Sequence, residues 1–412
     1  MMRCVRNVVF CVLGVVFVSE NLLAEPLIID HNHRDVTELT EDEIHRAKDV
    51  LHIGYGHTSH GSQLTTGMNG LVGFANGGGQ GMSYSNNIFA WNNGGTGGAL
   101  DLHDEAMGGD CGYYPQWVNN TTSYLDDPAN SNVNVIIWSW CGQMSDKWSG
   151  GSLSNEYLIP MSNLETSYPD VVFVYMTGHV DIWDDSDQKG GAQAIRDYCT
   201  ANDKVLYDFS DIERYNPDGT YFEYVHDTCD YYATNGGSGY QGNWATEWQG
   251  AHTETVDWYD CGSLHSQPLN ANQKAYAAWH LWTSIAYDLD RDGIGDEWEE
   301  RYGSTDTFKS GTNDCDGDGV CDYHEFIADS NPTNESSFFQ ISDMNHTNSQ
   351  TVSFACSSNR IYSLQCSTNL LDLQWDTVAG QTNVQGEGDG ILSMTDTNEY
   401  PLNNYRVQVS LP

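Results

Sequence analysis

Short apolar runs alternate with helical stretches over residues 25–287 of this chain. Four of the runs are rich in β-branched residues, which is typical of strands buried in a parallel sheet. Residues 270–287 carry apolar and aromatic residues at helical spacing and predict a closing helix. The pattern predicts a layered α/β domain with a parallel sheet covered on both faces. The predicted strands are residues 50–55, 134–139, 171–176 and 204–209.

The pattern changes twice after residue 287. Residues 288–335 are rich in Asp, and residues 336–412 carry short alternating segments separated by Asn and Gly. Such alternation is typical of an antiparallel sheet with one buried face. We expect a small all-β sandwich at the C-terminus, which could bind carbohydrate, anchor the protein to a surface or act as a spacer. Its clearest strand segments are residues 351–355, 362–365 and 405–409.

Residues 1–24 have the pattern of an export signal. Arg3 and Arg6 precede an apolar run over residues 8–18, and the small residue Ala24 follows at a suitable cleavage position. That run is shorter than the roughly 20 apolar residues that a membrane-spanning helix needs, and no other stretch approaches this length. The sequence predicts a secreted or periplasmic protein without a membrane span.

Composition adds a constraint on partners. The chain has 412 residues, of which 39% are apolar, so it can form two or three hydrophobic cores. Its 16 Lys and Arg residues face 58 Asp and Glu residues, giving a net charge of 16 − 58 = −42. A surface this acidic repels polyanions, so we do not expect nucleic acid as a partner.

Cysteine usage allows several disulfides. Of the 11 cysteines, Cys4 and Cys11 lie in the predicted export signal, which leaves nine. In an oxidising compartment most of these would pair, and at least one would be left over. The expected pairs are Cys315 with Cys321, Cys356 with Cys366, and Cys229 with Cys261.

Two stretches of twelve residues between residues 288 and 325 repeat one arrangement of acidic residues. Each has carboxylates at positions 1, 3, 5, 9 and 12 and a glycine at position 6. Calcium prefers about six to eight oxygen ligands, which these carboxylates provide together with the carbonyl group at position 7. The predicted Ca²⁺ ligands are Asp288, Asp290, Asp292, Ile294, Asp296 and Glu299, and then Asp314, Asp316, Asp318, Val320, Asp322 and Glu325.

These stretches resemble EF-hand-type loops and the Asp-rich calcium repeats of thrombospondin type 3. The resemblance implies a structural ion in a spacer of a secreted multidomain protein. Without the ion the carboxylates would repel one another, so we expect calcium to order this segment.

A candidate nucleophile follows the first predicted strand. The strand runs into Gly-His-Thr-Ser-His-Gly-Ser-Gln at residues 56–63, and residues 64–72 can be helical. A serine at a turn between strand and helix, flanked by glycines, can present its hydroxyl at the carboxyl edge of a parallel sheet. Ser59 has this position. His265, just before the predicted closing helix, could accept the serine proton while a nearby carboxylate holds its ring.

The order of serine, aspartate and then histidine before a final helix resembles that of the SGNH or GDSL-type hydrolases. The resemblance rests on residues 56–61, on the strand that ends at residues 141–143, and on residues 260–265. It implies a doubly wound sheet and an ester hydrolase. The implied roles are Ser59 as nucleophile, His265 as general base, Asp260 as the residue that orients it, Gln143 as oxyanion donor in place of the usual Asn, and a glycine such as Gly95 or Gly97 as backbone donor.

The chain departs from that family's pattern at two places. Members usually have Asp-Ser after the glycine, whereas His57 and Thr58 intervene here, so Thr58 or Ser62 could be the nucleophile instead. The aspartate lies two residues further from the histidine than usual, and Gly262 stands at the usual position. Asp257 is therefore an alternative carboxylate.

Several histidines fall at or near predicted strand ends, where an α/β sheet places its ligand crevice. His179 could be a substrate clamp near the oxyanion. Alternatively, three of these imidazoles could hold Zn²⁺ or another transition metal with an open position for water. The histidines are His57, His60, His179 and His265.

Tryptophans in the α/β region could line a sugar-binding cleft, although core packing explains each one as well. With export and calcium modules, they favour a polysaccharide or acylated glycan as substrate. We expect a secreted serine ester hydrolase; the alternatives are a non-catalytic, calcium-dependent carbohydrate-binding or adhesive protein and a metal-dependent hydrolase. The tryptophans are Trp138, Trp140, Trp148, Trp183, Trp244, Trp248 and Trp258.

Overall fold

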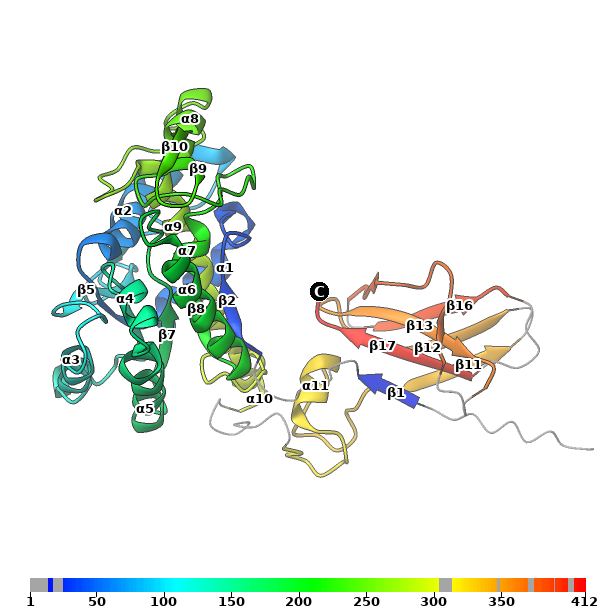
Figure 1. Cartoon of the computed structure of the whole chain (residues 1–412). Helices are drawn as coiled ribbons and strands as arrows, with labels where there is room; N and C mark the ends of the chain where they lie inside the picture. The colour runs from blue at the N-terminus through cyan, green and yellow to red at the C-terminus, as the bar shows by residue number, and fades with distance from the viewer. Residues whose placement is uncertain are drawn as a thin grey trace, which may run out of the picture. The chain divides into compact units, whose positions relative to one another are not determined.

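A computed structural model of the chain describes residues 14–17, 25–303, 313–346, 349–369, 374–388, 390–398 and 404–412. The chain divides into two compact units (Figure 1). One unit is Glu25–Asp290, and the other is Arg291–Pro412 together with the N-terminal residues up to Ala24. Each unit has its own hydrophobic core.

A parallel sheet of seven strands forms the centre of the unit Glu25–Asp290. Between the edge strands β2 and β4 the order is β8, β7, β6, β3, β5, so the winding direction reverses between β6 and β3. The predicted α/β layering is confirmed. In sheet order the strands are β2 (Leu27–Ile29), β8 (Val205–Tyr207), β7 (Val172–Met176), β6 (Val135–Trp138), β3 (His52–Gly56), β5 (Leu100–Met107) and β4 (Trp91–Asn92).

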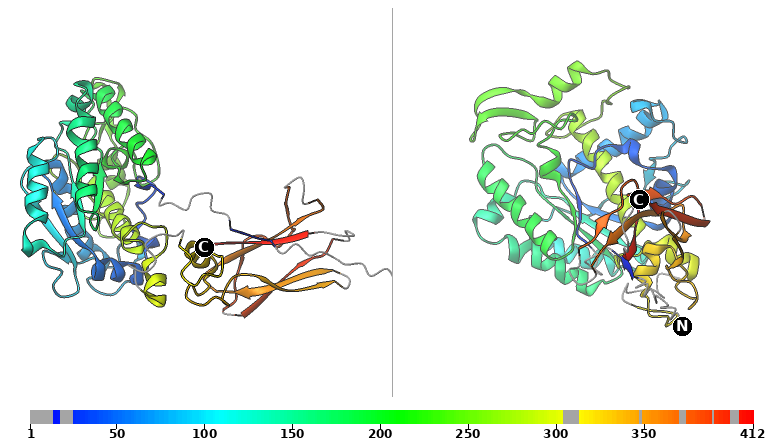
Figure 2. Two further views of the ribbon diagram at one scale, coloured as in Figure 1. Left: turned by 90° about the horizontal axis from the view of Figure 1, so that it is seen from below. Right: turned by 90° about the vertical axis from the view of Figure 1, so that its right-hand side faces the viewer.

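The central strands bury side chains on both faces, which explains their nearly continuous apolar sequences. In β6, Val135 and Ile137 pack into one core, whereas Ile136 and Trp138 pack into the other. Helices cover both faces (Figure 2). The first core includes α1 (Glu41–Val50), α2 (Ser62–Asn76) and α9 (Pro268–Tyr287); the second includes α3 (Gln116–Leu125), α4 (Met144–Ser149), α5 (Ile159–Ser167) and α6 (Asp185–Ala201).

The predicted strands and closing helix correspond to β3, β6, β7, β8 and α9. The apolar pattern does not predict β5, because polar residues occupy it. Asp101 Oδ2 lies 2.8 Å from His52 Nδ1, and its Oδ1 lies 3.1 Å from His103 Nε2, so these polar side chains satisfy one another within the sheet. The remaining elements of this unit are η1 (Val36–Glu38), η2 (Ser59–Gly61), η3 (Gly79–Gly81), η4 (Pro128–Asn130), η5 (Ser154–Leu158), α7 (Phe209–Ile212), β9 (Asp230–Thr234), β10 (Ser238–Asn243) and α8 (Trp244–Ala251).

The C-terminal unit contains the predicted antiparallel β region, folded as two sheets (Figure 2). Trp298 and Phe326, from the helices of the Asp-rich segment, pack into the same core as Phe354 and Tyr362 of the sheets. The Asp-rich residues therefore share a core with the β region. The two helices are α10 (Asp296–Tyr302) and α11 (Asp322–Ala328). One sheet consists of β11 (Ile341–His346), β12 (Gln350–Cys356) and β16 (Gly390–Asp396), and the other consists of β1 (Gly14–Phe17), β17 (Asn404–Ser410), β13 (Ile361–Ser367), β14 (Asp376–Thr377) and β15 (Val384–Gln385).

The nine cysteines from Cys111 to Cys366 all carry free thiols in the structure, so none of the expected disulfides is formed. Cys356 and Cys366 lie on β12 and β13, which belong to different sheets. Among the described helices, none combines the length and the apolar character needed to cross a membrane.

Candidate functional site

Three loops at the carboxyl ends of neighbouring strands form the candidate site. One follows β3 and contains Ser59, one follows β6 and contains Gln143, and one follows β7 and contains His179. The first two leave the sheet where its winding direction reverses. That position is the usual place of a ligand crevice in an open α/β sheet.

Ser59 and His265 meet at this edge although 206 residues separate them. The Ser59 Oγ lies 2.5 Å from the His265 Nε2, and the contact is exposed to solvent. Both residues have left-handed backbone conformations, with φ of 35° at Ser59 and 66° at His265. Residues that are not glycine seldom adopt this conformation, and strain of this kind often accompanies functional sites.

The turn that carries Ser59 is packed too tightly for side chains at its glycines. A Cβ atom on Gly61 would lie 2.2 Å from the Ser139 Oγ, and one on Gly56 would lie 2.4 Å from the Trp138 ring. The turn then enters η2 and α2. The Gly61 N–H donates to the Thr58 carbonyl at 2.9 Å, and the Ser62 N–H donates to the carbonyls of Ser59 and His60, so backbone hydrogen bonds hold the turn.

The two alternative nucleophiles make structural hydrogen bonds. The Thr58 hydroxyl donates to Asp110 Oδ2 at 2.9 Å, and the Ser62 hydroxyl donates to the backbone carbonyl of Ser59 at 2.7 Å. Neither hydroxyl has a hydrogen bond to an imidazole among the described residues. Ser59 is thus the hydroxyl of this turn that is paired with a base.

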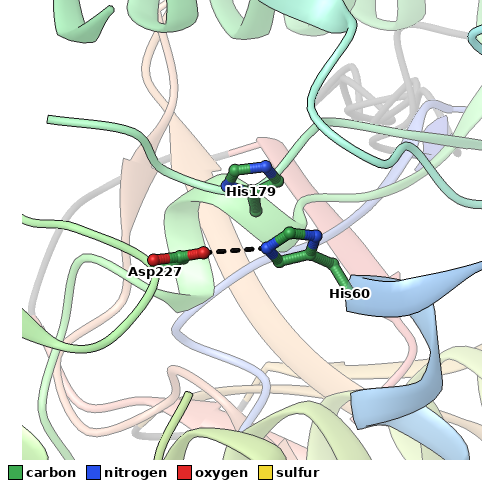
Figure 3. Close-up of side chains that lie close together, drawn as sticks. All are labelled: His60, His179 and Asp227. Atoms are coloured by element: carbon green, nitrogen blue, oxygen red, sulfur yellow. Dashed lines mark hydrogen bonds and ion pairs between the residues drawn. The ribbon is translucent and has the colours of Figure 1, made fainter. Parts of the chain in front are cut away.

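Three imidazole rings are stacked beside Ser59. The His60 ring lies 3.8 Å from that of His179 and 4.4 Å from that of His265, with interplanar angles of 8° and 20°. Figure 3 shows His60 Nε2 hydrogen-bonded to Asp227 Oδ2, at 2.8 Å. Burial lowers the pKa of His60, and this effect outweighs the hydrogen bond to Asp227, which alone would raise the pKa. The lowered pKa favours the neutral ring of His60.

Asp227 is a site residue that the sequence pattern does not predict. It is buried between His60 and His226, and their hydrogen bonds outweigh the effect of burial and hold its pKa well below the usual range. Burial disfavours a charged His226, but Asp227 and other nearby carboxylates outweigh it and raise the pKa of His226. Asp227 lies between α7 and β9 in a segment without regular structure, so no periodicity or spacing marks it.

The donor atoms of His60, His179 and Asp227 lie within 4.8 Å of one another, a group that could hold a metal ion. The His179 Nδ1 contacts the Val180 carbonyl at 2.8 Å, which leaves its Nε2 for a ligand. An imidazole nitrogen binds a metal ion that lies in the plane of its ring. Because the rings of His60 and His179 are parallel and stacked, a single ion cannot lie in the planes of both rings. One ring would have to turn. His57 lies outside this group and pairs with Asp104 at 2.7 Å.

Among the described residues, no hydrogen bond joins the remaining predicted site residues to Ser59 or His265. Asp260 is exposed, and no hydrogen bond between described residues joins it to His265. Asp257 accepts the N–H of Thr253 instead. Gln143 accepts the N–H of Cys141 through its Oε1 at 3.1 Å and packs against Gly112. Gly95 and Gly97 lie in the loop between β4 and β5, where Gly95 packs against Asp101.

In the C-terminal unit, the loop that begins at Asp314 is folded around its own carboxylates. Oxygen atoms of Asp314, Asp316 and Asp318 lie within 4.8 Å of one another. Gly319, with φ of 96°, donates its N–H to Asp314 at 3.0 Å, and Val320 donates its N–H to Asp318 at 2.7 Å. Asp322 and Glu325 are buried at the start of α11.

Four carboxylate oxygens of this loop are buried without a hydrogen-bond partner in the described part of the chain. Burial, together with the neighbouring carboxylates, raises the pKa of Glu325 to about 8. Buried carboxylates without donors are costly, and a divalent cation would satisfy them. The four atoms are Asp316 Oδ2, Asp318 Oδ2, Asp322 Oδ2 and Glu325 Oε2.

The first acidic loop spans the division between the two units, which falls between Asp290 and Arg291. Within the C-terminal unit, Ile294 is buried and donates its N–H to Asp292 at 2.8 Å. Asp296 and Glu299 are buried on α10. These residues repeat the placement of their counterparts in the second loop.

A scan against protein-family models, a search of curated proteins and a search of solved structures each give no match for this chain.

Proposed function

We propose that the unit Glu25–Asp290 is a serine ester hydrolase of the SGNH type. The observation that carries the proposal is the hydrogen bond of 2.5 Å between the Ser59 hydroxyl and the His265 Nε2. It joins a nucleophile and a base at the edge of a parallel sheet, in contact with solvent. The strand order, with its reversal between β6 and β3, supports the same assignment. Replacing Ser59 by Ala tests it.

In this mechanism, His265 takes the proton from the Ser59 hydroxyl as its oxygen attacks the ester carbonyl carbon. The oxyanion that forms needs hydrogen-bond donors nearby, which backbone N–H groups of the turn around Ser59 would supply. His265 then gives its proton to the departing alcohol, which leaves an acyl group on Ser59. Water, activated by His265, releases the acid and restores the serine. The neutral His60 ring and the ionised Asp227 behind it favour the transient imidazolium of His265.

The tryptophans support an acylated carbohydrate as substrate at one position. Trp138, Trp140, Trp244 and Trp258 are buried, whereas Trp148 is 42% exposed and Trp183 is 62% exposed. The Trp148 ring packs against Gly190 of α6, which leaves Trp183 as the more exposed of the two. Trp183 follows His179 by four residues in the same loop. A Cβ on Gly237 would lie 2.5 Å from its ring, and the His226 ring lies 6.3 Å away at 67°. Supported on these sides, its exposed surface is available to stack on a sugar ring.

Replacing Trp183 by Ala should lower kcat/KM for an acetylated polysaccharide by about 3- to 10-fold, because a lost aromatic contact costs about 0.5–1.5 kcal/mol. Turnover of an aryl acetate should not change. The control is Tyr221→Ala, which removes an aromatic side chain that is 49% exposed and packs near Tyr215. Equal losses on both substrates, or equal losses in both variants, would contradict a sugar contact at Trp183.

The grouping of His60, His179 and Asp227 supports a metal-dependent hydrolase as the second candidate. The parallel stacking of the His60 and His179 rings argues against this candidate, because one ring would have to turn before both could bind the same ion. We expect 1,10-phenanthroline, which removes transition metals, to leave the turnover of an aryl ester within about twofold. Elemental analysis serves as the control measurement. About one equivalent of a transition metal per chain, lost together with activity in the chelator, would replace the serine mechanism by the metal mechanism.

We propose that the C-terminal unit binds Ca²⁺ as a structural ion at the loop Asp314 to Glu325, and that the loop Asp288 to Glu299 binds a second ion. The buried carboxylate oxygens without hydrogen-bond partners in the second loop carry this proposal. Their donor set is all oxygen, as calcium prefers. Export to a compartment with abundant calcium would keep such sites filled. Unfolding with and without calcium tests the proposal.

A further inference from the structure

A buried ion pair lies beneath the candidate active site. Lys274 of α9 and Glu213 are 0% and 1% exposed, and the Lys274 Nζ lies 2.6 Å from the Glu213 Oε1. Burying two charges is costly unless further hydrogen bonds satisfy them. Lys274 also donates to Gln63 Oε1 on α2, and its Nζ lies 3.7 Å from the centre of the Phe209 ring.

Hydrogen bonds from Gln63 and Glu213 reach the residues next to His265 and His179. The Gln63 Nε2 donates to the carbonyl of Leu264, the residue before His265, at 2.5 Å. The Glu213 Oε2 accepts the N–H of Val180, the residue after His179, at 2.7 Å. Gln63 and Glu213 are thus tied to the two loops whose imidazoles lie on either side of His60.

A further arm holds the other side of His265. Asn270, buried in the first turn of α9, donates to Glu213 Oε1 at 3.3 Å and to the hydroxyl of Ser266 at 2.7 Å. His265 is therefore flanked by two held residues, Leu264 through its backbone carbonyl and Ser266 through its side-chain hydroxyl. This matters because a left-handed residue other than glycine costs about 1–2 kcal/mol and persists only where its surroundings hold it.

The ring of His265 has no hydrogen bond to a carboxylate among the described residues. In a serine hydrolase such a carboxylate usually sets the direction of the ring. Here the ring is stacked on His60, and the loop below it is tied to the buried network. The orientation of the His265 ring thus depends on the hydrogen-bonded backbone of its loop and on stacking against the His60 ring.

We propose that Gln63, held by the Lys274–Glu213 pair, is a positioning residue that aligns His265 with the Ser59 hydroxyl. The inference rests on the proposed function. None of these three residues touches the reacting atoms, so their effect passes through the Leu264 carbonyl and the loop after it. The rival explanation is an ion pair and amide that stabilise the fold alone.

The test compares Gln63→Met with Asn272→Ala. Gln63→Met keeps the size and removes both hydrogen bonds of the amide. Asn272 is buried on α9, makes two hydrogen bonds of 3.1 Å to the backbone of Tyr259 and donates to the Cys261 Sγ at 3.5 Å. Among the described residues, no hydrogen bond joins it to residues 264–266. It matches Gln63 in burial and bonding but does not hold His265.

We expect Gln63→Met to lower kcat on an aryl ester by about 10- to 100-fold with KM within about twofold, because a displacement of about 1 Å can cost about 10²-fold. Asn272→Ala should lower the thermal midpoint to a similar extent and leave kcat within about twofold. Unchanged kcat in Gln63→Met, or equal losses of kcat in both variants, would overturn the positioning role.

A paired replacement checks the charges themselves. Lys274→Met with Glu213→Gln leaves no buried charge, so this double variant should fold more stably than either single variant. Because Gln63 loses its lysine partner, kcat should stay at least about 10-fold below that of the unmodified protein. Recovery of kcat together with stability would overturn the proposal. The unmodified protein and Ser59→Ala are measured in the same assay, and lack of turnover by the unmodified protein would overturn both the hydrolase and the network.

Discussion

Replacing Ser59 by Ala is expected to lower the turnover of a simple aryl ester by at least about 10⁴-fold. The reason is that the variant loses the oxygen that forms the acyl intermediate, while the stacked histidines and the tight turn remain. His265→Ala should produce a loss of similar size. Because the two side chains act as one unit, the double variant should be no slower than either single variant. Initial rates on p-nitrophenyl acetate measure all three.

The neighbouring hydroxyls provide matched controls. Ser62→Ala and Thr58→Val remove hydroxyl groups from the same turn, and each should keep kcat within about 10-fold. Asp260→Ala should have less than about threefold effect on kcat, because its carboxylate is exposed and no hydrogen bond among the described residues joins it to His265. Turnover that survives in Ser59→Ala would move the nucleophile elsewhere. If the unmodified protein hydrolyses no acyl ester yet binds glycans, the non-catalytic binding protein is the better account.

Removing the calcium ion bound by the loop Asp314 to Glu325 is expected to destabilise the C-terminal unit by about 4 kcal/mol relative to a solution with free calcium at about 1,000 times its Kd. The physical cause is that the buried carboxylates of the loop lose the cation that compensates their negative charge. Thermal unfolding in EGTA and in calcium measures the difference, and protease cleavage within residues 291–332 reports it locally. Glu325→Gln should raise the Kd for calcium at least about 10-fold. Identical unfolding in both solutions would contradict calcium binding.

The pH dependence of the metal-free unit follows from the same carboxylates. The pKa of Glu325 is raised from 4.5 to about 8, chiefly by burial. Because the folded unit holds this proton more tightly than the unfolded chain, the contribution to stability is complete below about pH 4.5 and is lost as the pH rises through 8. Calcium binds the ionised carboxylate, so its affinity should rise over the same range. Unfolding in EGTA at several pH values measures the first effect.

The sequence predicted those parts of the fold that depend on local pattern. The apolar runs of β3, β6, β7 and β8 are buried on both faces, so their composition alone marks them. The pattern did not predict β5, because its polar residue Asp101 is satisfied by His52 of the neighbouring strand β3, a pairing between segments that lie far apart in the sequence. The edge strand β2, of three residues, is too short to show any periodicity.

The site was predictable only where a residue lies next to a regular element. Ser59 follows β3, and His265 precedes α9, so their positions suggested that they meet. Asp227 lies in an irregular segment, and its place under His60 depends on tertiary packing. Asp260 was predicted to orient His265 from its spacing alone, but no hydrogen bond among the described residues joins them. Spacing along a turn does not give the direction in which a side chain points.

The contact between Ser59 and His265 is exposed to solvent, and this exposure determines from which directions a long substrate can approach the pair. A reactive pair at the bottom of a narrow tunnel would accept only chain ends. A pair open to solvent can be reached from the side by an ester in the middle of a polymer. A hydrolase of the proposed kind would then remove acyl groups at internal positions of a chain, and a polymer blocked at both ends should be deacylated as fast as an unblocked one.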